Sequence, residues 1–147
     1  MELISPAFEP GTRIPAKYTK EGNDVSPPLS WNDVPAAARS FALVCDDPDA
    51  PTAEPWVHWL LWNIPANATE IPEGGSGFGI EGTNSFGEPG YGGPMPPPGH
   101  GTHHYHFTLY ALDGDVAIEP GASKESLLRA MDGHVLAEAE YVGTYER

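Results

Sequence analysis

The sequence predicts a mainly β protein, and two observations carry that prediction. Glycine and proline number 17 each among the 147 residues, and they separate short apolar segments instead of forming a repeat. Short apolar runs between turn-forming residues are typical of strands joined by turns. With 39% hydrophobic residues, a chain of this length can build one compact core, so we expect residues 1–147 to form a single domain.

Four segments are expected to be strands. Phe41–Cys45 is continuously apolar, as in a strand that is covered on both faces. The segment Val57–Ile64 is similar, and Pro65 ends it. His103–Leu112 alternates in part between apolar and polar residues, and Glu138–Tyr145 is the expected last strand.

One helix is expected near the C-terminus, beginning after Ser123 and ending at Gly133. The Ser123 hydroxyl can act as an N-cap, and Gly133 supplies a stop signal. One face of this helix would carry Leu127, Leu128 and Met131. The segment Val135–Ala139 stays open, because it could begin the last strand or extend the helix.

Two regions rich in proline and glycine complete the chain. Residues 1–30 are expected to be irregular or edge-strand chain that covers the core. Residues 73–101 hold eleven of the 17 glycines and form one long loop. Because this loop also carries the aromatic residues Phe78, Phe86 and Tyr91, we expect order in it, with glycines that let the backbone approach a ligand.

The net charge of −14, from 7 basic and 21 acidic residues, excludes two classes of partner. A field of that sign repels nucleic acids and anionic membrane surfaces. The N-terminus lacks the features of a signal peptide, and no apolar run is long enough to span a bilayer, so we expect a cytoplasmic protein. Cys45 is the only cysteine and lies in an apolar run, so we expect a buried, inert thiol.

The first candidate site residues follow the strand that ends at Cys45. Asp47 and Asp49 flank Pro48, and two carboxylates at this spacing in extended chain point the same way. They could accept hydrogen bonds, bind metal or orient histidines, and an Asx-type turn that ends the strand is the alternative.

Further along, His58 lies in an apolar strand, and by alternation it shares a face with Leu60, Trp62 and Ile64. A core histidine with one hydrogen bond is the alternative for His58.

A second histidine cluster opens the strand at His103. Period-two geometry puts His103 and Tyr105 on one face and His104 and His106 on the other. An imidazole and a phenol could therefore face one cavity, whereas adjacent histidines that point apart cannot chelate a metal together. Because no nucleophile motif is present either, we favour a binding role over catalysis and expect no cofactor and no bound metal.

Three motifs in order make the chain resemble the phosphatidylethanolamine-binding protein family, also called Raf-kinase-inhibitor-like, in its short prokaryotic branch. The motifs are Asp47–Pro51, His58–Pro65 and Gly90–Gly99, the last of which continues into Gly101–Tyr105. Further similarity in the N-terminal 31 residues extends the resemblance over essentially the whole chain. The resemblance implies two packed antiparallel β-sheets and a small anion pocket between loops at the strand ends.

Carried onto this chain, the resemblance implies a ligand site made of Asp47, Asp49, Ala50, His58, Gly93, Met95, Pro96, Pro97, His103 and Tyr105. Its ligand would be a phosphate or phosphoryl head group, and the protein would be a regulatory or inhibitory binding module, with a regulated protein as a further partner. A homodimer is expected from the prokaryotic relatives. The alternatives are a protease or kinase inhibitor that acts through the proline-rich loop at residues 94–98, or a hydrolase.

Overall fold

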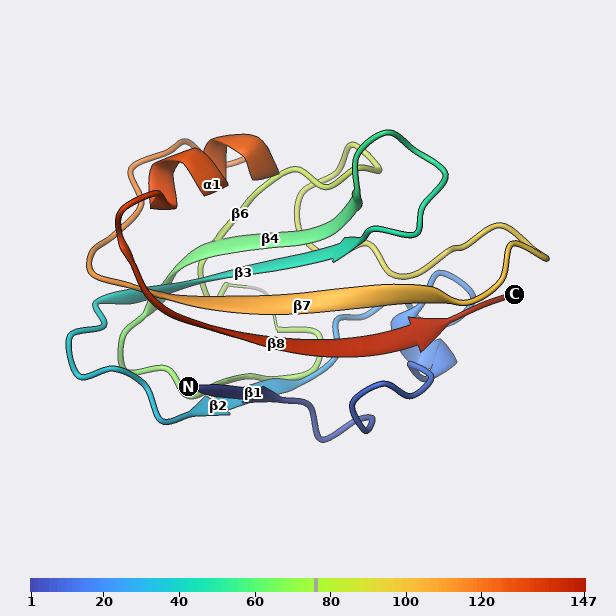
Figure 1. Ribbon diagram of the computed structural model, residues 1–147, viewed down its shortest axis with the longest axis horizontal. Coiled ribbons are helices and arrows are strands. Elements are labelled where there is room, and N and C mark those ends of the chain that lie inside the picture. Colours follow the sequence, from blue (N-terminus) through green and yellow to red (C-terminus); the bar gives the residue numbers. More distant parts are fainter. Residues whose placement is uncertain (76) are drawn as a thin grey trace.

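The computed structural model describes residues 1–75 and 77–147, and this part of the chain forms two antiparallel β-sheets (Figure 1). The larger sheet has the strand order β6-β4-β3-β7-β8, and the smaller has the order β1-β2-β5. In chain order the elements are β1 (Glu2–Ile4), η1 (Ala16–Tyr18), β2 (Leu29–Asn32), β3 (Ser40–Asp47), β4 (Trp56–Pro65), β5 (Glu70–Ile71), β6 (Ile80–Glu81), β7 (His103–Leu112), α1 (Lys124–Met131) and β8 (Val135–Tyr145). The predicted mainly β fold with a helix near the C-terminus is confirmed.

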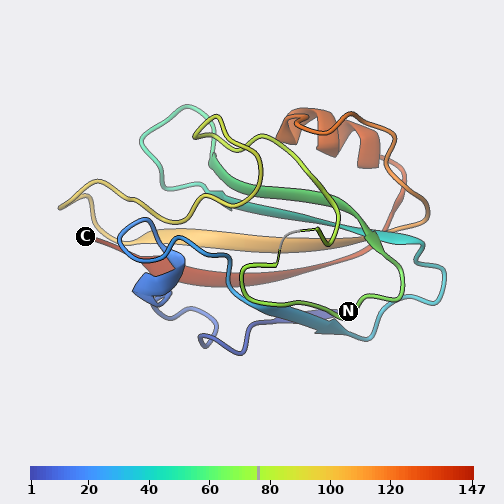
Figure 2. The same cartoon turned by 180° about the vertical axis from the view of Figure 1, so that it is seen from behind.

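The large sheet is covered on both faces (Figures 1 and 2). The small sheet lies against one face, and the core between the sheets includes Trp31, Phe41 and Phe107. Helix α1 lies against the other face, where Leu127 and Met131 belong to a second apolar cluster. Strand β3, in the middle of the large sheet, is therefore buried almost throughout, which explains its continuous apolar sequence.

Helix α1 lies where the sequence predicts it. The Ser123 hydroxyl accepts a hydrogen bond from the backbone N–H of Ser126, and Gly133 adopts a φ of 82° just beyond the helix. The buried apolar face is narrower than expected, because Leu128 is 39% exposed. The open segment after the helix is strand from Val135 onward, since the left-handed turn at Gly133 ends the helix first.

Strand β4 contains a β-bulge that simple alternation does not predict. Two consecutive residues of β3 pair with Val57 and Trp59, so His58 is an extra residue without a direct partner. Such a bulge changes the face to which neighbouring side chains point. Regular alternation would place His58 on one face with Leu60, Trp62 and Ile64. Leu60 and Trp62 instead pack under α1, so the expectation is wrong for these two residues. Ile64 does lie in the core between the sheets, but a second register shift in β4 brings it there.

The long loop contains strand β6, which pairs with β4, and part of the following chain also contacts β4. Backbone hydrogen bonds hold it there, from the N–H of Gly82 to the carbonyl of Leu60 and from the N–H of Gly92 to that of His58. The Tyr91 hydroxyl also donates to the carbonyl of Tyr18, at 2.5 Å. These contacts fix the glycine-rich chain against the end of the large sheet.

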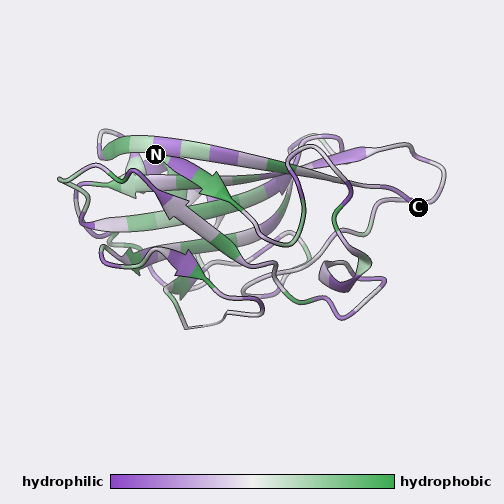
Figure 3. Cartoon of the chain, turned by 90° about the horizontal axis from the view of Figure 1, so that it is seen from below, coloured by the Kyte–Doolittle hydropathy of each residue, from purple (hydrophilic) through white to green (hydrophobic). Residues whose placement is uncertain are grey.

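The outer strands of the sheets carry both polar and apolar residues. Figure 3 shows hydrophilic residues interspersed with apolar ones along the outer strands, as in strands with one solvent-exposed face. The N-terminal region contributes β1, η1 and β2, connected by irregular chain, which agrees with the expectation for residues 1–30. In the described part of the chain, no helix has the length and apolar character needed to cross a bilayer.

Candidate functional site

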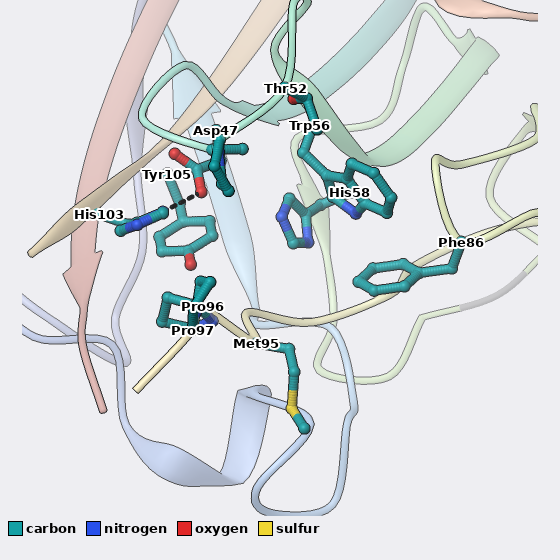
Figure 4. A pocket seen from close by; sticks show the side chains of 12 residues that line it. Asp47, Thr52, Trp56, His58, Phe86, Met95, Pro96, Pro97, His103 and Tyr105 are labelled. Carbon is teal, nitrogen blue, oxygen red and sulfur yellow. Dashed lines mark hydrogen bonds and ion pairs between the residues drawn. The ribbon is translucent and has the colours of Figure 1, made fainter. Parts of the chain in front are cut away.

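Three adjacent strands bring the candidate residues to one end of the large sheet. Strand β3 lies between β4 and β7 and is antiparallel to both, so its last residues meet the first residues of its neighbours. Asp47 pairs with Trp56, and the start of β7 supplies His103 and Tyr105. Between them lies a cavity of about 210 Å3, lined by Asp47, Ala50, Pro51, Thr52, Trp56, His58, Phe86, Met95, Pro96, Pro97, His103 and Tyr105 (Figure 4).

Asp47 and His103 form a buried pair at one side of the cavity. The Asp47 Oδ2 atom lies 2.6 Å from His103 Nδ1, and its Oδ1 atom accepts a hydrogen bond from the backbone N–H of Asp49. Because a carboxylate can only accept, this contact places a proton on Nδ1 of His103. The carboxylate therefore fixes the orientation and the tautomer of the ring.

Besides Asp47, His103 contacts a histidine that was not among the candidate residues from the sequence. His103 Nε2 lies 2.7 Å from Nδ1 of His100, an exposed residue in the loop before β7. One of the two nitrogens must donate and the other accept, so the contact allows one proton between the rings. Asp47, His103 and His100 thus form a hydrogen-bonded chain from the buried strand end to the surface.

His58 faces the cavity from the bulge in β4. Its Nδ1 lies 2.6 Å from the carbonyl oxygen of Gly92, which can only accept, so Nδ1 carries a proton. Burial lowers the pKa of His58 below its ordinary value of 6.5, although the Gly92 carbonyl and the Asp47 carboxylate act in the opposite direction. The neutral ring then presents an unprotonated Nε2, and Figure 4 shows the ring edge facing the space beside Asp47 and Tyr105.

Tyr105 lies beside His58 on the same side of the sheet. The two rings meet edge to face, with their centroids 5.1 Å apart. Burial, together with the negative charges of Asp47 and Asp49, raises the pKa of the Tyr105 hydroxyl well above its ordinary value. The hydroxyl therefore keeps its proton and can donate a hydrogen bond into the cavity.

The remaining wall of the cavity is apolar. Trp56 and Phe86 pack edge to face at 5.4 Å, and the exposed Met95 lies at the rim. The lining residues that sequence reasoning missed are Pro51, Thr52, Trp56 and Phe86. Trp56 could have been found two positions before His58 in the same strand, whereas nothing in the sequence distinguishes Phe86 within the long loop.

The structure does not place Asp49 and Gly93 on the cavity wall. The Asp49 carboxylate accepts hydrogen bonds from the backbone and the ring of His104, on the outer face of β7. Burial acts to raise its pKa, but the His104 contacts outweigh this and lower it. The N–H of Gly93 donates to Asp24. All the other residues that the resemblance implied line the cavity.

One lysine lies near the cavity and is paired with an aspartate. Lys20 pairs with Asp24 at 2.8 Å, and its Nζ lies 4.4 Å from the ring centroid of Phe86. Among the described residues, no group of three or more histidine, cysteine or acidic side chains is arranged to hold a metal ion.

The comparisons with known proteins identify the family and the fold of the chain. The family model for phosphatidylethanolamine-binding protein matches residues 4–146. The chain belongs to this family. A relative from the archaeon Methanothermobacter thermautotrophicus, named UPF0098 protein, is 49% identical over 100% of this chain and 99% of its own length. A second UPF0098 protein, from Pyrococcus horikoshii, is 48% identical over 98% of this chain and 76% of its own length.

Two solved structures of family members share the whole fold. A homologue from Chlamydia trachomatis is 44% identical with a TM-score of 0.93, and the match covers 99% of this chain and 97% of that one. YbcL from Escherichia coli, described as a new member of the mammalian family, is 32% identical, also with a TM-score of 0.93, over 99% of this chain and 98% of its own. The family resemblance read from the sequence is confirmed.

Proposed function

We propose that the protein binds a small anion with a phosphoryl group in the cavity between β3, β4 and β7. The observation that carries this proposal is the convergence of two histidines and a tyrosine on one small cavity beside a buried carboxylate. His58, His103 and Tyr105 come from two separate strands, and each has a polar atom near the cavity. Imidazole and phenol groups are effective partners for oxyanions.

The size and wall of the cavity limit the ligand. A volume of about 210 Å3 lies below the usual range for drug-sized ligands, and it suits a phosphate group with a few further atoms. Trp56, Phe86 and Met95 form an apolar side, which favours an organic ester over a free inorganic ion. The name of the family refers to a lipid with a phosphoryl head group, which is consistent with this ligand class.

The overall charge of −14 sets the conditions for binding. A negative field slows the approach of an anion, so the attraction must come from groups in the site. The Tyr105 hydroxyl on the cavity wall can supply part of that attraction as a hydrogen-bond donor, whereas the charge of the nearby Lys20 is paired with Asp24. In a regulatory module of the kind we propose, the same site would hold a phosphorylated small molecule or side chain in the cytoplasm.

Calorimetry with phosphate and phosphoethanolamine tests the proposal. We expect saturable binding that weakens by about 1–3 kcal/mol in His103→Ala, the range for loss of a hydrogen bond that involves a charged group, here the contact between His103 and Asp47 on the cavity wall. The substitution would also leave the Asp47 carboxylate without its partner beside the anion. His134→Ala is a matched control, since His134 is exposed and contacts Asp113 away from the cavity. Absence of saturable binding for both ligands would overturn the proposal.

A further inference from the structure

The cavity wall presents an acceptor at His58 and, beside it, a donor at Tyr105. The Nδ1 proton of His58 is committed to the carbonyl of Gly92, at 2.6 Å. The other ring nitrogen, Nε2, makes no hydrogen bond to any described residue, and in the neutral ring it carries a lone pair. The Tyr105 hydroxyl lies beside this ring and can donate. A ligand that satisfies both atoms must accept at Tyr105 and donate at His58.

The surroundings of His58 keep it in this neutral form. The charged or titratable groups around it are Asp47 from β3, His103 and Tyr105 from β7, and Lys20 from the chain after η1. Asp46 of β3 acts from farther away, because its carboxylate pairs with Lys124 of α1. Burial lowers the pKa of His58 most, and the carboxylates and the Gly92 carbonyl oppose this only in part, while Lys20 adds to the lowering. Protonating Nε2 is therefore harder here than for a histidine in water.

We propose that the site selects an oxyanion that carries a proton, such as the monoanion of a phosphate monoester, and discriminates against oxyanions without one. This inference rests on the proposed function and specifies its ligand. The P–OH group would donate to His58 Nε2, and an anionic oxygen would accept from the Tyr105 hydroxyl. An oxyanion without a proton would place a lone pair against the lone pair of Nε2.

The charge of the site works in the same direction. The buried Asp47 carboxylate lies on the same wall, so a second negative charge on the ligand is repelled at short range. A fully ionised ligand would have to draw a proton onto His58, and that protonation is disfavoured by burial. A monoanion with its own proton meets neither difficulty.

A comparison of the affinities for methyl phosphate and methyl sulfate separates the need for a proton on the ligand from the effect of its charge. At pH 5.5 methyl phosphate is mainly a monoanion, because the second pKa of a phosphate ester is about 6. Methyl sulfate has a similar shape and the same charge but no proton. By calorimetry with the full chain, we expect methyl phosphate to bind at least about tenfold more tightly, because methyl sulfate leaves a buried acceptor unpaired.

The pH dependence gives a second measurement with a definite sign. As the pH rises from 5.5 to 8, the monoanionic fraction of methyl phosphate falls by roughly 50- to 100-fold, given a second pKa of about 6. The apparent affinity for methyl phosphate should fall with it. The affinity for methyl sulfate, which has no proton to lose in this range, should remain weak throughout.

A variant and its control attribute the discrimination to His58. In His58→Gln the side-chain amide can turn an N–H toward the ligand, so methyl sulfate should approach methyl phosphate in affinity. His134→Gln changes an exposed histidine outside the cavity and should keep the discrimination. If His58→Gln does not fold, the nitrogen chemical shifts of His58 in the unmodified protein report its tautomer, and a proton on Nε2 at pH 7 would contradict the inference.

The outcomes distinguish the two proposals. If neither ligand binds at any pH, the proposed function itself fails. If both bind with equal affinity at pH 5.5, or methyl sulfate binds more tightly, the anion site stands and the selection for a proton is wrong. A tenfold preference for methyl phosphate that disappears in His58→Gln supports both.

Discussion

The protein has one buried and one exposed aspartate–histidine pair at the start of β7. The exposed pair can therefore serve as a reference for the strength of the buried contact at the cavity. In the pair Asp47–His103 the nitrogen and oxygen lie 2.6 Å apart, and the side chains are 4% and 2% exposed. In the pair Asp49–His104 the distance is 2.8 Å, and the side chains are 41% and 49% exposed. Both pairs join a carboxylate to Nδ1 of a histidine at the start of β7, and they differ strongly in solvent exposure.

The structure sets the expected magnitudes for alanine double-mutant cycles on both pairs. The buried pair should show a coupling energy of about 1.5–3 kcal/mol, the range for a hydrogen bond that involves a charged group. His103→Ala alone should cost about 3 kcal/mol, because it leaves the buried Asp47 carboxylate without its hydrogen-bond partner. The exposed pair should show a coupling of about 0–1 kcal/mol.

Urea denaturation followed by tryptophan fluorescence, at one fixed pH for all seven proteins of the two cycles, measures these couplings. The slopes against urea concentration should agree among variants, so that differences in midpoint report differences in stability. Equal couplings in the two pairs would refute the reasoning that burial of Asp47 and His103 makes their contact strong. A larger coupling for Asp49–His104 would refute it more directly.

Three further predictions concern the surroundings of the site. The pKa of His58 in the folded protein lies below 6.5, so the unfolded chain binds more protons than the folded one as the pH falls through that value. The free energy of unfolding of the unmodified protein should therefore fall more steeply below pH 6.5 than that of His58→Asn. Urea titrations at pH 7.5 and 5.5 compare the two, and parallel losses would contradict this. Gly93→Ala should destabilise the protein by about 1–3 kcal/mol, because a Cβ there would lie 2.5 Å from the carbonyl oxygen of Tyr18, and thermal unfolding measures the loss. Burial, with the nearby Asp46 and Asp47, raises the pKa of Cys45 well above its usual range, so a thiol reagent should label it only at the rate of unfolding, and rapid labelling of the folded protein would count against this.

The fold could be read from the sequence where local signals agreed with the tertiary arrangement. The apolar run Phe41–Cys45 indicated a strand covered on both faces, and β3 has that position. Ser123 and Gly133 marked the two ends of the helix with side-chain and backbone chemistry that acts within a few residues. Such signals need no knowledge of distant contacts.

The candidate site was predictable only in part, for reasons that lie in particular residues. Motif order indicated Asp47, His58, His103 and Tyr105, and the structure brings these four to one cavity. Alternation in β4 failed at His58, because a bulge depends on how two strands pair and leaves no mark in a single strand. Phe86 joins the wall through the path of a long loop, which sequence periodicity cannot describe.

The sequence by itself determined which chemical groups the site can use, the strong negative charge around them and the strands that carry them. Only the tertiary structure decided that Asp47 turns inward to His103 while Asp49 turns outward to His104, and that His100 contacts His103. It also decided that the carbonyl of Gly92 holds the Nδ1 proton of His58. The physical reason is that the proton positions of a histidine depend on the groups that pack against it, and the two carboxylates and the Gly92 carbonyl lie tens of residues from their histidines along the chain.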